Sequence, residues 1–189
     1  IAFSKGNDTQ LIQRTSCWFF IANIFNVAWL FAWLSEWTLT SVAIMLGIFF
    51  SLLQIIINTN TTSLRINRIQ RLVTGWPIGI YFGWISVALI ANIAAYLAKI
   101  NWKPVLFDAT GWTVTLIIVA VGINLFVLFR KNLVSFSLVG IWAFVAIYFR
   151  HLEDQVVISN TAIFGAFAIT VSVIYHIKKF FFAATASDR

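Results

Sequence analysis

Six long stretches without a charged residue run through this chain of 189 residues. A helix needs about 20 apolar residues, within a range of roughly 17–25, to cross the hydrocarbon core of a bilayer. All six stretches are long enough: residues 15–35, 37–64, 72–98, 109–129, 132–149 and 155–177. Segments such as 42–53 and 116–128 do not alternate polar and apolar residues, which excludes a β-barrel. The sequence therefore predicts an all-α, polytopic membrane protein with six transmembrane helices in a bundle.

The composition agrees with lipid as the surrounding solvent. Hydrophobic residues make up 61% of the chain and charged residues only 10%, whereas a soluble domain carries about a quarter charged residues. The formal net charge of +7 is therefore attributed to basic loop residues that anchor the chain at the lipid surface. Nucleic acid is not expected as a partner. Cys17 is the one cysteine, which excludes an internal disulfide and a thiolate metal cluster.

The basic residues sort unequally between the two sides of the predicted bundle. One side carries ten of them: Lys5, Arg14, Arg65, Arg68, Arg71, Arg130, Lys131, Lys178, Lys179 and Arg189. The other side carries three: Lys99, Lys103 and Arg150. Basic residues in short loops stay on the cytoplasmic side during insertion. Both termini are therefore expected on the cytoplasmic or stromal side of a bacterial inner membrane or an organellar membrane such as the thylakoid.

The spans lack the groups that most membrane chemistry requires. No Asp, Glu, Lys or Arg lies in the middle of a span, which argues against a pump, an ion-coupled carrier or a retinal-type photoreceptor. No catalytic triad, paired carboxylate or phosphate loop is present either, so the chain is not expected to be an enzyme. His151 is interpreted as a solvated loop residue. His176 is interpreted as a snorkelling group at a helix end, with ligation of a tetrapyrrole metal as the alternative.

Neutral polar groups and indoles recur at helical spacing within two of the spans. In the first span one face carries Ala22, Asn26, Trp29 and Trp33, and in the third span one face carries Tyr81, Trp84, Ala88, Ala91 and Asn92. Such faces serve either for hydrogen bonding between helices or for binding a ligand. A neighbouring stripe, Gly75, Gly79 and Gly83, is typical of close helix packing.

At these residues the sequence resembles the TspO/MBR family of tryptophan-rich sensory and translocator proteins. The family's Leu-Asn-x-Ala-Trp motif is matched by Phe25-Asn26-Val27-Ala28-Trp29, and its Tyr-Leu-Ala-Trp helix is similar to Tyr81-Phe82-Gly83-Trp84 followed by Ala91-Asn92. The sequence of residues 80–94 is similar to that of a longer bacterial and algal branch of the family, which has extra carboxyl-terminal helices. Leu30 replaces the family's Pro, and Ala91 replaces its Leu.

This resemblance implies a division of the chain. Residues 1–14 form an amino-terminal segment, 15–98 a TspO-like three-helix part, 99–180 an additional three-helix part, and 181–189 a tail. The likeness covers about residues 15–97. The family's first two helices are expected to be missing from this chain.

The resemblance also implies a function, namely a receptor or carrier that binds a planar hydrophobic molecule. The ligand classes are a tetrapyrrole, a chlorophyll-type pigment or a sterol, and the implied ligand-binding residues are Asn26, Trp29, Trp84, Ala88, Ala91 and Asn92. A shared pocket requires the first and third spans to pack side by side. The alternative function is a structural or accessory subunit of a larger membrane complex. The expected partners are the lipid bilayer, a hydrophobic small molecule, and other membrane subunits or a second copy.

The sorting of basic residues generates a topology prediction. Single cysteines that replace Lys103 and Arg68, in a Cys17→Ser chain, should react with a membrane-impermeant thiol reagent from opposite sides of sealed vesicles. Labelling of both positions from one side would contradict the predicted order of the spans.

Overall fold

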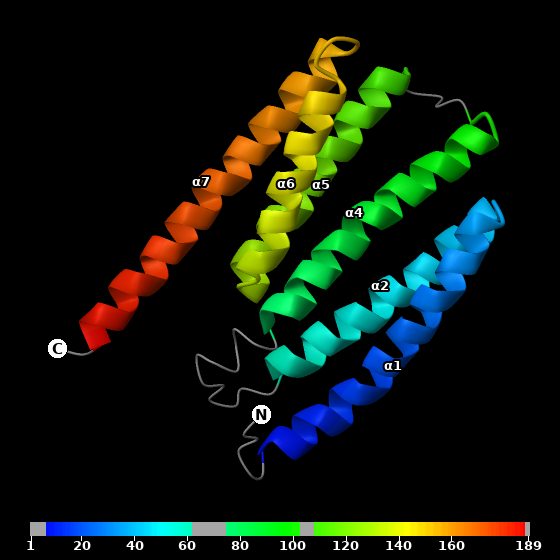
Figure 1. The fold of residues 1–189 in the computed structure, drawn as a ribbon. Helices are drawn as coiled ribbons and strands as arrows, with labels where there is room; N and C mark the ends of the chain where they lie inside the picture. Colours follow the sequence, from blue (N-terminus) through cyan, green and yellow to red (C-terminus); the bar gives the residue numbers. More distant parts are fainter. Residues whose placement is uncertain (1–6, 62–74, 103–107, 188–189) are drawn as a thin grey trace. The chain divides into compact units, whose positions relative to one another are not determined.

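The computed structural model describes residues 7–61, 75–102 and 108–187, and its regular elements are all α-helices. They are α1 (Asn7–Leu34), α2 (Thr38–Thr61), α4 (Trp76–Lys99), α5 (Ala109–Lys131), α6 (Val134–Arg150) and α7 (Val156–Ser187) (Figure 1). The all-α class predicted from the sequence is confirmed within these ranges. Long apolar runs form helices because each backbone N–H and C=O is then bonded within its own segment.

Five of these helices are long and apolar enough to cross a membrane: α1, α2, α4, α5 and α7. The remaining helix, α6, has 17 residues and lies at the short limit for crossing the hydrocarbon core. A helical membrane protein is therefore confirmed, whereas the count of six spans stays a prediction.

The chain divides into two compact units, Ile1–Trp102 and Lys103–Arg189. Among the described helices, α1, α2 and α4 belong to the first unit, and α5, α6 and α7 to the second. The division predicted from the sequence, between residues 98 and 99, falls inside the last turn of α4. The structural boundary lies beyond that helix, in the segment that follows Asn101.

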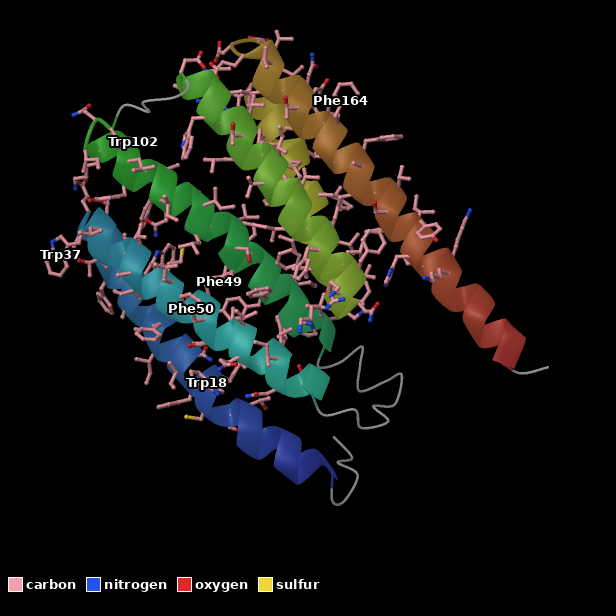
Figure 2. The ribbon with its side chains drawn as sticks, turned by 180° about the vertical axis from the view of Figure 1, so that it is seen from behind. Trp18, Trp37, Phe49, Phe50, Trp102 and Phe164 are labelled. Carbon is pink, nitrogen blue, oxygen red and sulfur yellow. The ribbon has the colours of Figure 1, made fainter. Side chains whose placement is uncertain are left out.

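In the first unit α2 lies between α1 and α4 (Figure 1). The turn between α1 and α2 is short, and Glu36 takes a left-handed conformation there with φ 57°. Lys99 at the end of α4 donates from Nζ to the carbonyl oxygen of Glu36 at 2.7 Å. Figure 2 shows Trp37 and Trp102 at this same end of the unit, as expected for an aromatic belt at the membrane surface.

Small residues bring α2 close to both of its neighbours. A Cβ at Gly47 of α2 would lie 2.8 Å from the ring of Phe25 on α1, so the absence of a side chain admits that ring. On the other side, Gly79 and Gly83 of α4 are buried, which agrees with the packing stripe predicted from the sequence. The Phe49 and Phe82 rings pack 5.0 Å apart between α2 and α4.

In the second unit α7 packs against both α5 and α6. The apolar core includes Ile117, Leu128, Phe144, Ile158 and Ile169. Asp108 caps the start of α5 by accepting a hydrogen bond from the Gly111 N–H at 2.8 Å. Asn132 ends α5 with φ 55° and ψ 32°, the left-handed conformation that lets α6 follow at once.

One contact in this unit depends on a glycine. The Asn124 amide of α5 lies against Gly140 of α6, and a Cβ at Gly140 would meet three atoms of that amide at 2.5–2.8 Å. Asn124 is only 7% exposed, so the amide has little room to move away. Gly122 of α5, in contrast, has open space where a Cβ would be.

The same substitution at these two glycines should therefore have different effects on stability. Gly140→Ala should lower the free energy of unfolding by about 1–3 kcal/mol, because it overpacks the contact with Asn124. Gly122→Ala should leave it unchanged or raise it by up to about 1 kcal/mol, since alanine favours the helix. The free energies of unfolding of both variants are measured by unfolding the protein in mixed detergent micelles. Equal effects would show that the Gly140 contact does not limit packing.

Candidate functional site

The six residues that the sequence assigns to a ligand site lie on α1 and α4 of the first unit. Their exposure differs widely. Asn26, Trp84 and Ala91 are exposed, Trp29 and Ala88 are half-buried, and Asn92 is buried.

Asn92 is the best-anchored member of this set. Its Nδ2 donates to Ser41 Oγ at 2.7 Å and lies 3.6 Å from Met45 Sδ, so it joins α4 to α2. The interpretation of this polar group as a hydrogen bond between helices is therefore confirmed for Asn92. Its Oδ1 is buried and has no hydrogen-bond partner among the described residues, which leaves one acceptor inside the unit.

Trp29 occupies a different environment on α1. Its ring stacks on Trp33, one turn away, with ring centroids 6.1 Å apart and an interplanar angle of 23°. The indole Nε1 is buried and has no hydrogen-bond partner in the described part of the chain. Trp84 of α4 is 49% exposed, so the two indoles differ in their surroundings.

The structure does not pack α1 and α4 side by side. Each packs on α2, which lies between them. The short α1–α2 turn forces these two helices into an antiparallel hairpin, and Asn92 then finds its partner, Ser41, on α2 rather than on α1. The side-by-side packing of the first and third spans that a shared pocket requires is therefore not found among the described helices, and the ligand-binding role of the six residues stays a prediction.

A shallow hollow lies instead on the outer face of α1. It is lined by Phe20, Asn23, Ile24, Val27 and Ala28, and none of the six predicted residues lines it. These residues were not predicted from the sequence, because Asn23 is the one polar side chain among the five. Their recurrence at steps of three and four was the available signal, since such steps place residues on one helical face.

The second unit holds further buried polar groups. Asn124 Oδ1 and Ser137 Oγ are buried without a hydrogen-bond partner in the part of the chain that the structure describes. His176 of α7 is only 7% exposed, and its ring meets that of Phe129 edge-on at 5.9 Å. His176 lies near the end of the apolar stretch Val156–Lys179 of α7, as the sequence predicts. The snorkelling part of the interpretation is wrong, because the ring is buried against Phe129 of α5 and does not reach toward the membrane surface.

The Asn92–Ser41 bond should contribute measurably to the packing of the first unit. Asn92→Ala and Ser41→Ala should each destabilise the protein, and a double-mutant cycle should give a coupling of about 0.5–1 kcal/mol, as measured for hydrogen bonds between membrane helices. Asn160→Ala, at an exposed amide of α7, is the control and should change the unfolding free energy by less than about 0.5 kcal/mol. Strictly additive effects of Asn92→Ala and Ser41→Ala would contradict the assignment.

Comparison with known proteins assigns the chain to a family. No curated protein and no solved structure matches the chain. A family model described as TSPO-like protein matches residues 1–175. The likeness thus extends through both units, whereas the sequence motifs had indicated only about residues 15–97. On this match, which spans most of its length, the chain belongs to the TSPO-like protein family.

Proposed function

We propose that this chain is a non-enzymatic integral membrane protein of TspO type that serves as a structural or accessory subunit of a larger membrane assembly. The observation that supports this most is the exposed side chain of Asn26, in the middle of the apolar stretch Thr15–Leu34 of α1. An amide without a polar partner in hydrocarbon costs on the order of a few kcal/mol. A neighbouring protein surface would remove that cost.

The low burial of α1 supports the same function. Only 11% of its apolar stretch is buried, compared with 39% of that of α2. On α4, Trp84 and Ala91 are also exposed. Both residues lie at motif positions of the family, so the faces that carry the family likeness are largely open to contact from outside the unit.

In the first unit the predicted ligand residues are divided between two helices, which favours the accessory function over an enclosed ligand site. Asn26 and Trp29 lie on one helix, Trp84 and Asn92 on another, and α2 separates the two helices. The hollow on α1 is shallow and lined from a single helix. A tetrapyrrole, a chlorophyll-type pigment or a sterol would therefore have to be bound with the help of a further surface.

A receptor or carrier for such a molecule is the second candidate function, and one observation favours it. Phe25 packs on Gly47, so Trp29, one turn further along α1, lies near the level of Ala43 on the antiparallel α2. Asn92 bonds to Ser41 and contacts Met45, at that same level. An indole donor and an amide acceptor, both unpaired within the described part of the chain, thus flank one turn of α2, and a neutral polar ligand group would satisfy either.

The proposed membrane is a bacterial inner membrane or an organellar one, with both termini on the cytoplasmic or stromal side. This part of the proposal is supported by the ten-to-three sorting of basic residues described above, because positively charged loops resist translocation.

The accessory function predicts an assembly in native membranes. Extracted in mild detergent, the chain should migrate in a particle whose protein mass clearly exceeds its own 21.4 kDa. Asn26→Val should reduce the assembled fraction about tenfold, because it removes a hydrogen-bonding group. Asn160→Val, at another exposed amide, is the matched control and should leave it unchanged.

A different result would favour the second candidate. A monomer that binds a porphyrin in equal stoichiometry, with affinity lost in Trp29→Phe but retained in Trp142→Phe, would contradict the accessory function and support a receptor or carrier. Trp142 is an exposed indole of the second unit.

A further inference from the structure

Four basic residues lie at one end of the second unit and constitute its basic end. Arg130 and Lys131 belong to the last turn of α5. Lys178 and Lys179 lie where the apolar stretch Val156–Lys179 of α7 ends. Lys131 is half-buried and the other three are exposed, so most of this charge reaches the surface of the unit.

The four cations lie at nearly the same depth. α5 and α7 run parallel, because α6 reverses the chain between them (Figure 1). The rings of Phe129 on α5 and His176 on α7 meet with their centroids 5.9 Å apart, and the basic residues follow this contact by one to three positions on each helix. Since a helix rises about 1.5 Å per residue, two neighbouring helices place their charges in one narrow layer.

No carboxylate balances this charge within the part of the unit that the structure describes. The described carboxylates of the unit lie at its other end. Asp108 precedes α5, and Glu153 and Asp154 lie in the turn between α6 and α7. The basic end is therefore open to an anion from outside the chain.

Helix capping accounts for only part of this arrangement. Arg130 and Lys131 stabilise the carboxyl-terminal end of α5, where the backbone carbonyl groups carry partial negative charge. Lys178 and Lys179 have no such role, because α7 continues beyond them to Ser187. The sorting of charge that orients the chain acts through basic residues of the loops, so it does not require two lysines within a helix.

Exposed aromatic rings lie on the hydrocarbon side of the basic end. Phe126 of α5 is 61% exposed and Tyr175 of α7 is 60% exposed. Phe126 precedes Arg130 by four residues, and Tyr175 precedes Lys179 by four, so each cation shares a helical face with an exposed ring one turn deeper in the membrane. A molecule that contacts both has an anionic head and apolar chains.

We propose that the basic end binds anionic phospholipid, whose phosphate groups contact Arg130 and Lys179 while its acyl chains cover Phe126 and Tyr175. The planar guanidinium of arginine matches two phosphate oxygens, and the lysine ammonium adds a point charge. A zwitterionic lipid carries its own cation, which the basic end repels. This inference goes beyond the proposed function, because a subunit and a receptor would each present the same basic end to the lipid.

The test uses the full chain, purified in detergent and mixed with equal amounts of phosphatidylglycerol and phosphatidylcholine that carry identical acyl chains. Native mass spectrometry measures the ratio of the two lipids bound, and phosphatidylglycerol should be preferred by at least about tenfold. Arg130→Gln and Lys179→Gln should each reduce this preference by about fivefold, the effect expected for one basic residue near a lipid surface. Arg150→Gln is the matched control and should retain the preference, because Arg150 is also exposed in the last turn of a helix but lies at the other end of the unit.

Equal binding of the two lipids by the unaltered chain would overturn the proposal. A loss in Arg150→Gln as large as that in Arg130→Gln would also overturn it, since total charge would then explain the preference. Arg130→Lys keeps the charge and should retain most of the preference, so an equal loss in this variant would show that charge is not the cause. Release of the lipid by an equal concentration of inorganic phosphate would identify a free anion as the ligand instead of a lipid.

Discussion

Hydrocarbon offers no hydrogen bonds, and this constraint governs the whole molecule. Backbone groups are satisfied within each helix, so the costly groups that remain are side-chain amides and hydroxyls. Several hydroxyl groups are satisfied within their own helices, because each donates a hydrogen bond to a carbonyl oxygen one turn back. They belong to Ser51, Thr59, Ser86, Thr115, Thr170 and Ser172. Asparagine amides are harder to satisfy in this way, because each carries two N–H donors and an acceptor. The positions of Asn23, Asn26, Asn92 and Asn124 therefore determine where the helices need neighbours.

Two of these amides are buried and shape the packing of their units. Asn92 joins α4 to α2 through Ser41, and Asn124 lies on Gly140 between α5 and α6. Lipid tails are as apolar as leucine, so helices in a membrane gain little from hydrophobic burial and depend on close approach and on such polar contacts. In this respect the glycines and asparagines contribute more to the specificity of packing than the many leucines, isoleucines and phenylalanines do.

The other two amides, Asn23 and Asn26, are exposed on α1, and they connect the fold to function. In the family motif Asn26 and Trp29 accompany a second set on α4, yet α2 lies between the two helices. Some motif residues of this chain are therefore buried, and others lie exposed on outer faces of the helices. An assembly in the membrane would cover the exposed ones. The family likeness spans both units, so the second unit is part of the region that defines membership of the family.

The sequence alone determined the helical class, the positions of most spans and the family motifs, since run length, charge and backbone bonding are properties of each segment. It did not determine which faces meet. Helices that are apolar all round carry only a weak signal of the side that contacts a neighbour. Asn92 and Asn26 belong to similar motifs, but only the tertiary structure separates a buried bond to Ser41 from an exposed amide. From the sequence, His176 is likewise interpreted as a group at the end of a span, and only the structure shows that its ring is buried against Phe129. The burial of a side chain depends on which helix lies next to it. In this protein the neighbours are determined by the short α1–α2 turn, by the glycines that permit close approach, and by the partners available to each amide.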